Sequence, residues 1–194
     1  MARKGCLVGL LFIALLLGGV YLCIRPSRRE KTIVTAARTC LGDRYDSNRY
    51  QGGPPPRGRG ACTDVIYWGY RPVLDLQQAV NQDVLHNPQF YSGRPDRDLD
   101  YRWCPKLIVW FRRHALSLPT EVNWSTVSTF RPADVVFFDD GQGVAGHVGI
   151  VSDRWSLAGL PLLIHNPGPL AVEENALQSN RLLGHFRLKG GESD

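Results

Sequence analysis

A helical pattern begins at Cys62 in the sequence GACTDVIYWGY (residues 60–70), directly after a loop rich in glycine, proline and arginine. Apolar or small residues recur on one helical face at Cys62, Val65, Ile66, Gly69 and Tyr70. A thiol in the first turn lies in the positive field of the helix N-terminus, which favours the thiolate. Because the thiolate is the nucleophilic form, this position indicates a reactive cysteine. The alternative is that Cys62 is a small core residue, as lone cysteines often are.

Two histidines flank strand-like runs later in the chain. His147 opens the run HVGIV (residues 147–151), and His165 closes the run LLIH (residues 162–165). A cysteine on a helix, followed by histidines on strands, can build a Cys–His nucleophile with a third group that orients the imidazole. We therefore predict Cys62, His147 and His165 as catalytic residues. Asn166 competes with His165 for the orienting role, because a neutral amide can also hold an imidazole.

The periodicity predicts helices in the first part of the chain and strands in the last. Proline at position 72 interrupts the helical pattern, since it lacks a backbone donor. Helices are predicted for residues 30–41, 62–70, 74–85 and 105–116, with loops at 42–60 and 87–101. Strands are predicted for residues 134–138, 147–153, 162–166 and 182–188, with a short one near 170–172. Helices followed by a small antiparallel sheet define an α+β architecture.

Four segments resemble the NlpC-type cysteine peptidases of the papain-like clan. They are residues 60–64 around Cys62, 131–138, 146–151 around His147, and 164–166. More narrowly, the chain is similar to a bacterial family known as domain of unknown function number 1287. That closer likeness is carried by residues 45–46, 62–65, 75–77, 147–153, 164–166 and 184–187. The resemblance covers about residues 30 to 189 and implies a papain-like fold, with the nucleophile helix packed on the sheet.

The same resemblance implies a function. It points to hydrolysis of amide bonds in peptidoglycan stem peptides through a thioester on Cys62. The chain departs from the NlpC pattern at Ala61, where an acidic residue is usual, and at Thr63, where a small residue is usual. It also has a longer gap between its two catalytic histidines. Two alternatives stay open: an amidase or acyltransferase acting on lipid amides, and a non-catalytic module that binds the cell wall.

Four further residues are predicted to contact substrate. Tyr45 and Tyr50 are candidate groove walls, although loop tyrosines can equally pack on a core. Asp64 can bind a substrate amine, or it can complement the helix N-terminus, which is the favoured interpretation. Asn166 is included because it follows His165 at the strand end.

The N-terminus predicts a membrane anchor. Residues 5–24 are uncharged and, as a helix, would span about 30 Å, the thickness of the bilayer core. No small-x-small cleavage site follows, so an uncleaved anchor is favoured over a signal peptide. We therefore divide the chain into an anchor with a basic linker (residues 1–29) and a papain-like domain (residues 30–194).

The orientation of this anchor has two conflicting indications. Positive charge is heavier after the apolar run than before it, which by the positive-inside rule places the domain in the cytoplasm. The resemblance to wall enzymes instead places the domain outside the membrane. We follow the resemblance and expect a single-pass protein whose domain faces the periplasm or the exterior.

Charge and cysteine content limit the kinds of partner and cofactor that are expected. The net charge is +5, but the basic residues are scattered and no nucleic-acid-binding motif is present, so a wall polymer or lipid surface fits better than nucleic acid. The chain has five cysteines and no C-x-x-C pair, so no metal or cofactor is predicted. Cys40 and Cys104 can form a disulfide or remain buried thiols, and buried thiols are favoured. The sequence carries no signal of oligomeric state.

Overall fold

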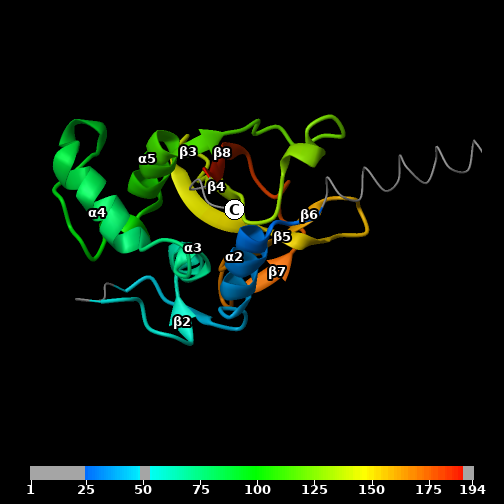
Figure 1. Ribbon diagram of the computed structural model, residues 1–194, viewed down its shortest axis with the longest axis horizontal. Helices are drawn as coiled ribbons and strands as arrows, with labels where there is room; N and C mark the ends of the chain where they lie inside the picture. Colours follow the sequence, from blue (N-terminus) through cyan, green and yellow to red (C-terminus); the bar gives the residue numbers. More distant parts are fainter. Residues whose placement is uncertain (1–24, 49–52, 190–194) are drawn as a thin grey trace, which may run out of the picture.

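The computed structural model describes residues 25–48 and 53–189. The predicted anchor and Tyr50 lie outside these residues. Among the described residues, no helix combines the length and the apolar character needed to cross a membrane. Helices and strands are labelled as in Figure 1, so the first helix described is α2.

The helices form as the apolar periodicity predicts, with local signals at their ends. Ser27 and Glu30 form a reciprocal capping box at the start of α2, and Asp75 accepts the Gln78 N–H at the start of α4. The helices are α2 (Arg28–Arg38), α3 (Cys62–Tyr70), α4 (Leu76–His86) and α5 (Cys104–His114), joined by the short 3-10 turns η1 (Pro88–Phe90), η2 (Asp100–Arg102) and η3 (Val127–Thr129).

The strands form one antiparallel sheet in the order β3-β8-β4-β5-β6-β7. They are β3 (Ala115–Ser117), β4 (Val135–Asp139), β5 (Ala145–Trp155), β6 (Pro161–His165), β7 (Val172–Glu174) and β8 (Leu182–Leu188). A separate parallel pair, β1 (Arg44–Tyr45) and β2 (Arg59–Gly60), precedes α3. The predicted class, α+β with N-terminal helices packed on a small antiparallel sheet, is confirmed.

Helices cover one face of this sheet. In Figure 1, α2 and α3 lie against the long curved strand β5, and α5 lies beside β3 and β8. Along β4, Val135 and Phe137 join the core under the helices, whereas Val136 and Phe138 join a second cluster. Because successive side chains of a strand point to opposite faces, the sheet has an apolar core on each side.

Among the differences between the prediction and the structure, three have a clear structural cause. The predicted loop at 42–60 contains β1 and β2, because Asp46 N–H and Arg44 N–H bond across to the segment before Cys62. The predicted helix at 105–116 ends at His114, because residues 115–117 pair with β8. The predicted helix at 74–85 begins at Leu76, where Asp75 supplies the cap. Each difference arises from a contact with a segment that is distant in the sequence or from a side-chain cap.

Candidate active site

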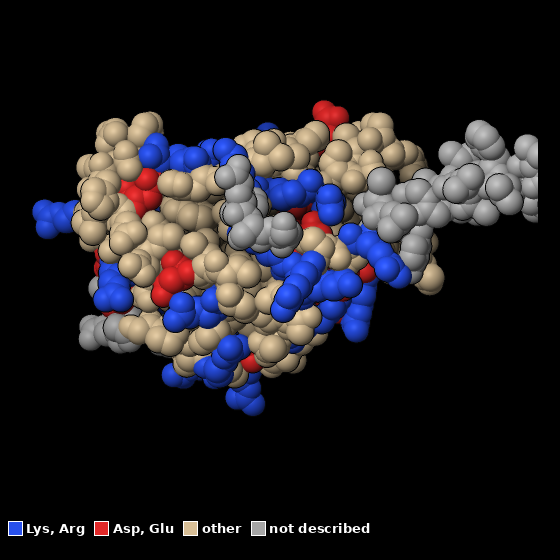
Figure 2. All heavy atoms as spheres, in the orientation of Figure 1, with Lys and Arg blue, Asp and Glu red and all other residues tan. Residues whose placement is uncertain are grey.

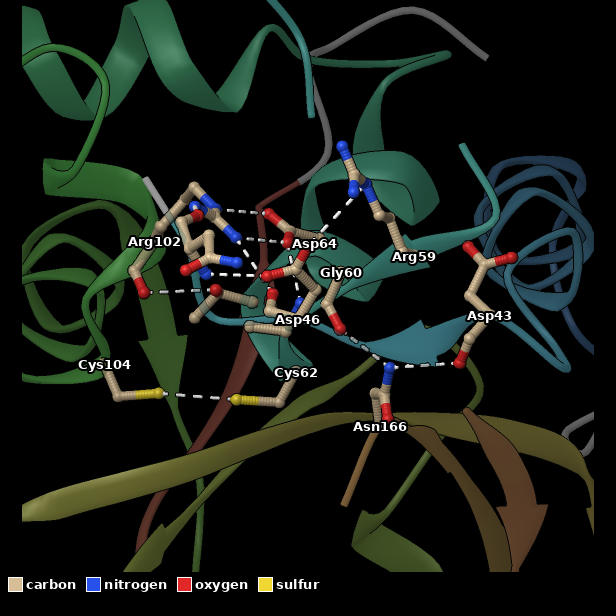
Figure 3. A network of polar contacts seen from close by, with 12 residues as sticks. Asp43, Asp46, Arg59, Gly60, Cys62, Asp64, Arg102, Cys104 and Asn166 are labelled. Atoms are coloured by element: carbon tan, nitrogen blue, oxygen red, sulfur yellow. Dashed lines mark hydrogen bonds and ion pairs between the residues drawn. The ribbon is translucent and has the colours of Figure 1, made fainter. Parts of the chain in front are cut away.

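Cys62 is the first residue of α3, and its neighbours are arranged to build that helix end. The preceding residue, Ala61, has no side chain that can cap the helix, and the Asp64 carboxylate instead accepts the Ala61 N–H at 2.7 Å. Arg102 binds both Asp64 oxygens, each at 2.8 Å (Figure 3). The Asp64 carboxylate is buried and is enclosed by these protein partners.

A second thiol lies beside the first. The Sγ atoms of Cys62 and Cys104 are 3.9 Å apart, and Cys104 is itself the first residue of α5. Hydrogen bonding from Cys104 lowers the pKa of Cys62 well below its usual value; burial opposes this, and His147 and the Val148 N–H add to it. The same contact and burial raise the pKa of Cys104. Of the two thiols, Cys62 is therefore the one whose pKa is lowered.

His147 and His165 are in direct contact. His147 lies near the start of β5 and His165 ends β6, and their Nε2 and Nδ1 atoms are 2.8 Å apart. On its other side, His165 Nε2 lies 3.1 Å from a carboxylate oxygen of Glu174 at the end of β7. Burial and the nearby His147 lower the pKa of His165, while Glu174 opposes that shift. The neutral form of His165 is thus favoured.

Asn166 makes a different set of contacts. Its side-chain amide donates to the carbonyl of Gly60 at 2.8 Å and to that of Asp43 at 3.3 Å (Figure 3). Its carbonyl oxygen accepts the Gly168 N–H at 3.2 Å. Asn166 is buried and holds the backbone just before Cys62, so His165 is the residue of the two that contacts His147.

Both thiols line an open cavity of about 950 Å³. Tyr45 contributes to its wall and is half exposed. Burial raises the pKa of the Tyr45 hydroxyl, with smaller effects from the two thiols. The lining residues are Tyr45, Ser47, Ala61, Cys62, Ser92, Gly93, Arg94, Pro95, Asp96, Leu99, Asp100, Arg102, Trp103, Cys104, Pro105, Lys106, Asp140, Val144, Ala145 and Gly146.

The charges on the face seen in Figure 2 are mixed. Lys and Arg side chains are spread over that face, with Asp and Glu among them. Within residues 25–48 and 53–189, no three His, Cys, Asp or Glu side chains gather in an arrangement that could hold a metal ion.

Sequence reasoning missed Cys104 and Glu174 as members of the site. The sequence did contain a signal for Cys104, because Cys104 stands at the start of a helical stripe, as Cys62 does. Glu174 had none, since nothing in the sequence near it pairs it with His165. The favoured prediction for Cys40 and Cys104 is confirmed: both are free, buried thiols.

The chain belongs to a family of α+β proteins described as a domain of unknown function, DUF1287, whose model matches residues 30–188. A relative of this chain is the uncharacterized protein YijF of Escherichia coli (strain K12). It is 40% identical over 149 residues, and the match covers 74% of this chain and 71% of that protein. The resemblance to this family stated from the sequence is therefore confirmed.

Two solved structures are similar in chain trace. One is a protein similar to a lipoprotein of the NLP/P60 family from Staphylococcus aureus subsp. aureus Mu50, with a TM-score of 0.44 and 15% identity over 86% of this chain and 43% of that one. The other is an N-acetylmuramoyl-L-alanine amidase from Bacteroides uniformis ATCC 8492, with a TM-score of 0.48 and 11% identity over 84% of this chain and all of that one.

Proposed function

We propose that this protein is a thiol hydrolase that cleaves amide bonds in peptidoglycan stem peptides through a thioester on Cys62. One observation carries the proposal: a thiol with a lowered pKa lies at a helix N-terminus beside a chain of two histidines and a carboxylate. A nucleophile, a base and a group that orients the base are the parts that nucleophilic acyl transfer requires. The stem-peptide substrate comes from the NlpC-like sequence segments.

In this mechanism the hydrogen-bond partners set where the two imidazoles carry their protons. An ionised Glu174 only accepts hydrogen bonds, so His165 Nε2 carries a proton and donates it. Neutral His165 then has a lone pair on Nδ1 and accepts the Nε2–H of His147 at 2.8 Å. This leaves Nδ1 of His147 as the nitrogen that can accept the Cys62 proton. Glu174 and His165 therefore act as positioning residues for the base.

The reaction follows from these roles. The Cys62 thiolate attacks the carbonyl carbon, and backbone N–H groups at the start of α3 stabilise the oxyanion that forms. Protonated His147 donates its proton to the leaving amine, so the C–N bond breaks and a thioester remains. His147 then takes a proton from water, which attacks the thioester, releases the acid and restores the Cys62 thiol.

The test is product analysis with the full-length chain in mild detergent and purified muropeptides. The wild type should produce fragments whose masses correspond to hydrolysis of one stem-peptide amide bond. Cys62→Ala should produce none, whereas the matched variant Cys40→Ala removes a buried thiol that does not line the cavity and should retain activity. Unchanged cleavage by Cys62→Ala would rule out the thiol mechanism.

The same assay separates the competing functions. Lipid amides are run in parallel with muropeptides. Release of fatty acid from lipid amides alone would favour the lipid amidase or acyltransferase. Tight binding to isolated cell wall without turnover of either substrate would favour the non-catalytic module.

We also propose that residues 5–24 anchor the chain, with the domain outside the cytoplasmic membrane. The support is the bilayer length of this uncharged run together with the wall substrate proposed above. Alkaline phosphatase fused to the C-terminus should be active. Activity only from a cytoplasmic reporter fused at the same place would refute this topology.

A further inference from the structure

The two neighbouring thiols lie at the starts of two different helices. Cys62 begins α3 and Cys104 begins α5, and their sulfur atoms are 3.9 Å apart (Figure 3). Cys62 is 7% exposed and Cys104 is 5% exposed, and both line the cavity of about 950 Å³. A small solute that enters the cavity can therefore reach both sulfurs. Cys40, also buried, does not line it.

An ion pair and a hydrogen bond join the two helix starts that carry these thiols. Arg102 lies two residues before Cys104 and binds both oxygens of Asp64, in the first turn of α3. The Thr63 hydroxyl donates to the Arg102 carbonyl at 3.1 Å. Both links join the turn after Cys62 to the turn before Cys104. The proximity of the sulfurs is thus built by a buried ion pair and a hydrogen bond.

A disulfide between these residues requires the sulfurs to close from 3.9 Å to the roughly 2.05 Å of an S–S bond. Reactive thiols that are reversibly oxidised commonly have a second thiol beside them that traps the first oxidation product. The mechanism proposed above uses Cys62 but gives no covalent role to Cys104.

We propose that Cys62 and Cys104 form a site of reversible oxidation that takes a hydroperoxide as its substrate. The Cys62 thiolate attacks one oxygen of the peroxide, the O–O bond breaks, and the departing oxygen takes up a proton. Sulfur is thereby oxidised to a sulfenic acid and the peroxide is reduced. The Cys104 sulfur then attacks the Cys62 sulfur, so an S–S bond forms, the S–O bond breaks, and hydroxide leaves as water with the Cys104 proton.

The disulfide occupies the nucleophile and turns the hydrolase off until a dithiol reductant restores both thiols. This consequence for activity rests on the proposed function. The oxidation itself does not, because it requires only the two sulfurs and the peroxide. Oxidation and hydrolysis can therefore be tested separately.

The experiment maps thiols in the full-length chain, reduced, held in mild detergent and treated with hydrogen peroxide. Free thiols are then blocked with iodoacetamide under denaturing conditions and the protein is digested with trypsin. Cleavage after Arg38, Arg59 and Arg102 places Cys40, Cys62 and Cys104 in separate peptides. The wild type should yield a linked Cys62–Cys104 peptide that has lost two hydrogen atoms, and dithiothreitol should reverse it.

Two variants make the result decisive. In Cys104→Ser, Cys62 has no partner and should proceed to sulfinic and sulfonic acids, which dithiothreitol does not reverse. Cys40→Ser should behave as the wild type. Circular dichroism and thermal melting establish that each variant is folded, and Cys104→Ala replaces Cys104→Ser if the serine disturbs the fold.

Three outcomes would overturn the proposal. The first is irreversible oxidation of Cys62 at the same rate in the wild type and in Cys104→Ser. The second is a disulfide from Cys62 to a different cysteine, and the third is no reaction of Cys62. A wild type that forms the Cys62–Cys104 disulfide but cuts no muropeptide refutes the hydrolase alone. A wild type that cuts muropeptides but forms no such disulfide refutes the oxidation site alone.

Discussion

Replacing Arg102 by methionine should destabilise the protein strongly. The side chains of Arg102 and Asp64 are only 3% and 4% exposed, and two hydrogen bonds of 2.8 Å join them. The substitution leaves the Asp64 carboxylate buried without its cation, which typically costs about 3–5 kcal/mol. With a urea dependence of about 2 kcal/mol per molar, this loss lowers the unfolding midpoint by roughly 1.5–2.5 M.

The deficit should depend on pH. Burial already raises the pKa of Asp64, and Arg102 is the main group that opposes this rise. Without Arg102, the pKa in the folded state rises further above the value in the unfolded chain. When the folded-state pKa of a carboxyl is raised, the group is protonated in the folded protein at low pH. The folded protein then loses stability as the pH rises through that pKa. The difference from the wild type should therefore be smaller at pH 5 than at pH 8.

Urea unfolding of the full-length chain, followed by far-UV circular dichroism at both pH values, measures these effects. The matched control is Arg71→Met, because Arg71 and Asp75 are also in close contact, at 2.9 Å, but their side chains are 48% and 37% exposed. That variant should change stability by less than about 1 kcal/mol. Adding Asp64→Asn to Arg102→Met should recover part of the loss. Equal effects for Arg71→Met and Arg102→Met, or a deficit that grows as pH falls, would refute the reasoning.

Three further results are expected. Iodoacetamide should label Cys62 faster than Cys104 in the folded protein, because the pKa of Cys62 is lowered and that of Cys104 is raised. Labelling of Cys62 should slow only at pH values below the usual pKa range of a thiol. Equal labelling rates of the two thiols by peptide mapping would contradict this. His147→Ala should lower muropeptide turnover by roughly two to four orders of magnitude, the range for a positioned base. His165→Ala should lower turnover by less, and His165→Asn should recover part of that loss. A larger loss in His165→Ala than in His147→Ala would reverse their roles. Glu174→Ala should lower turnover by less than about tenfold, because Glu174 is 52% exposed and acts through His165. Glu174→Gln keeps a hydrogen-bond acceptor and should retain activity. A loss of activity in Glu174→Gln would show that the charge of Glu174, and not its acceptor oxygen, matters.

Short-range patterns predicted most of the helices and strands, and they singled out the two histidines of the candidate site. The apolar stripe from Cys62 to Tyr70 matches α3 residue for residue. Alternating or continuous apolar runs located β4, β5, β6 and β8, because a strand that packs on both faces carries its own signal. His147 and His165 were found because both lie next to such runs.

Edge strands were harder to predict. β3 has three residues and exists because Ala115 and Ser117 pair with Leu188 and Phe186 of β8. β1 and β2 have two residues each and pair only across a loop. Segments this short have no periodicity of their own, so their strand conformation depends on a partner strand elsewhere in the chain.

The sequence by itself determined that Cys62 opens a helix and that two histidines adjoin strands, because these features depend on residues within a few positions of one another. Only the tertiary structure decided that Cys104 lies beside Cys62 and that Glu174 lies behind His165. Cys62 and Cys104 are 42 residues apart, and their contact requires α5 to be joined to α3 through the buried Arg102–Asp64 pair. His165 and Glu174 meet because β6 and β7 pair antiparallel, in a register set by hydrogen bonds between the strands.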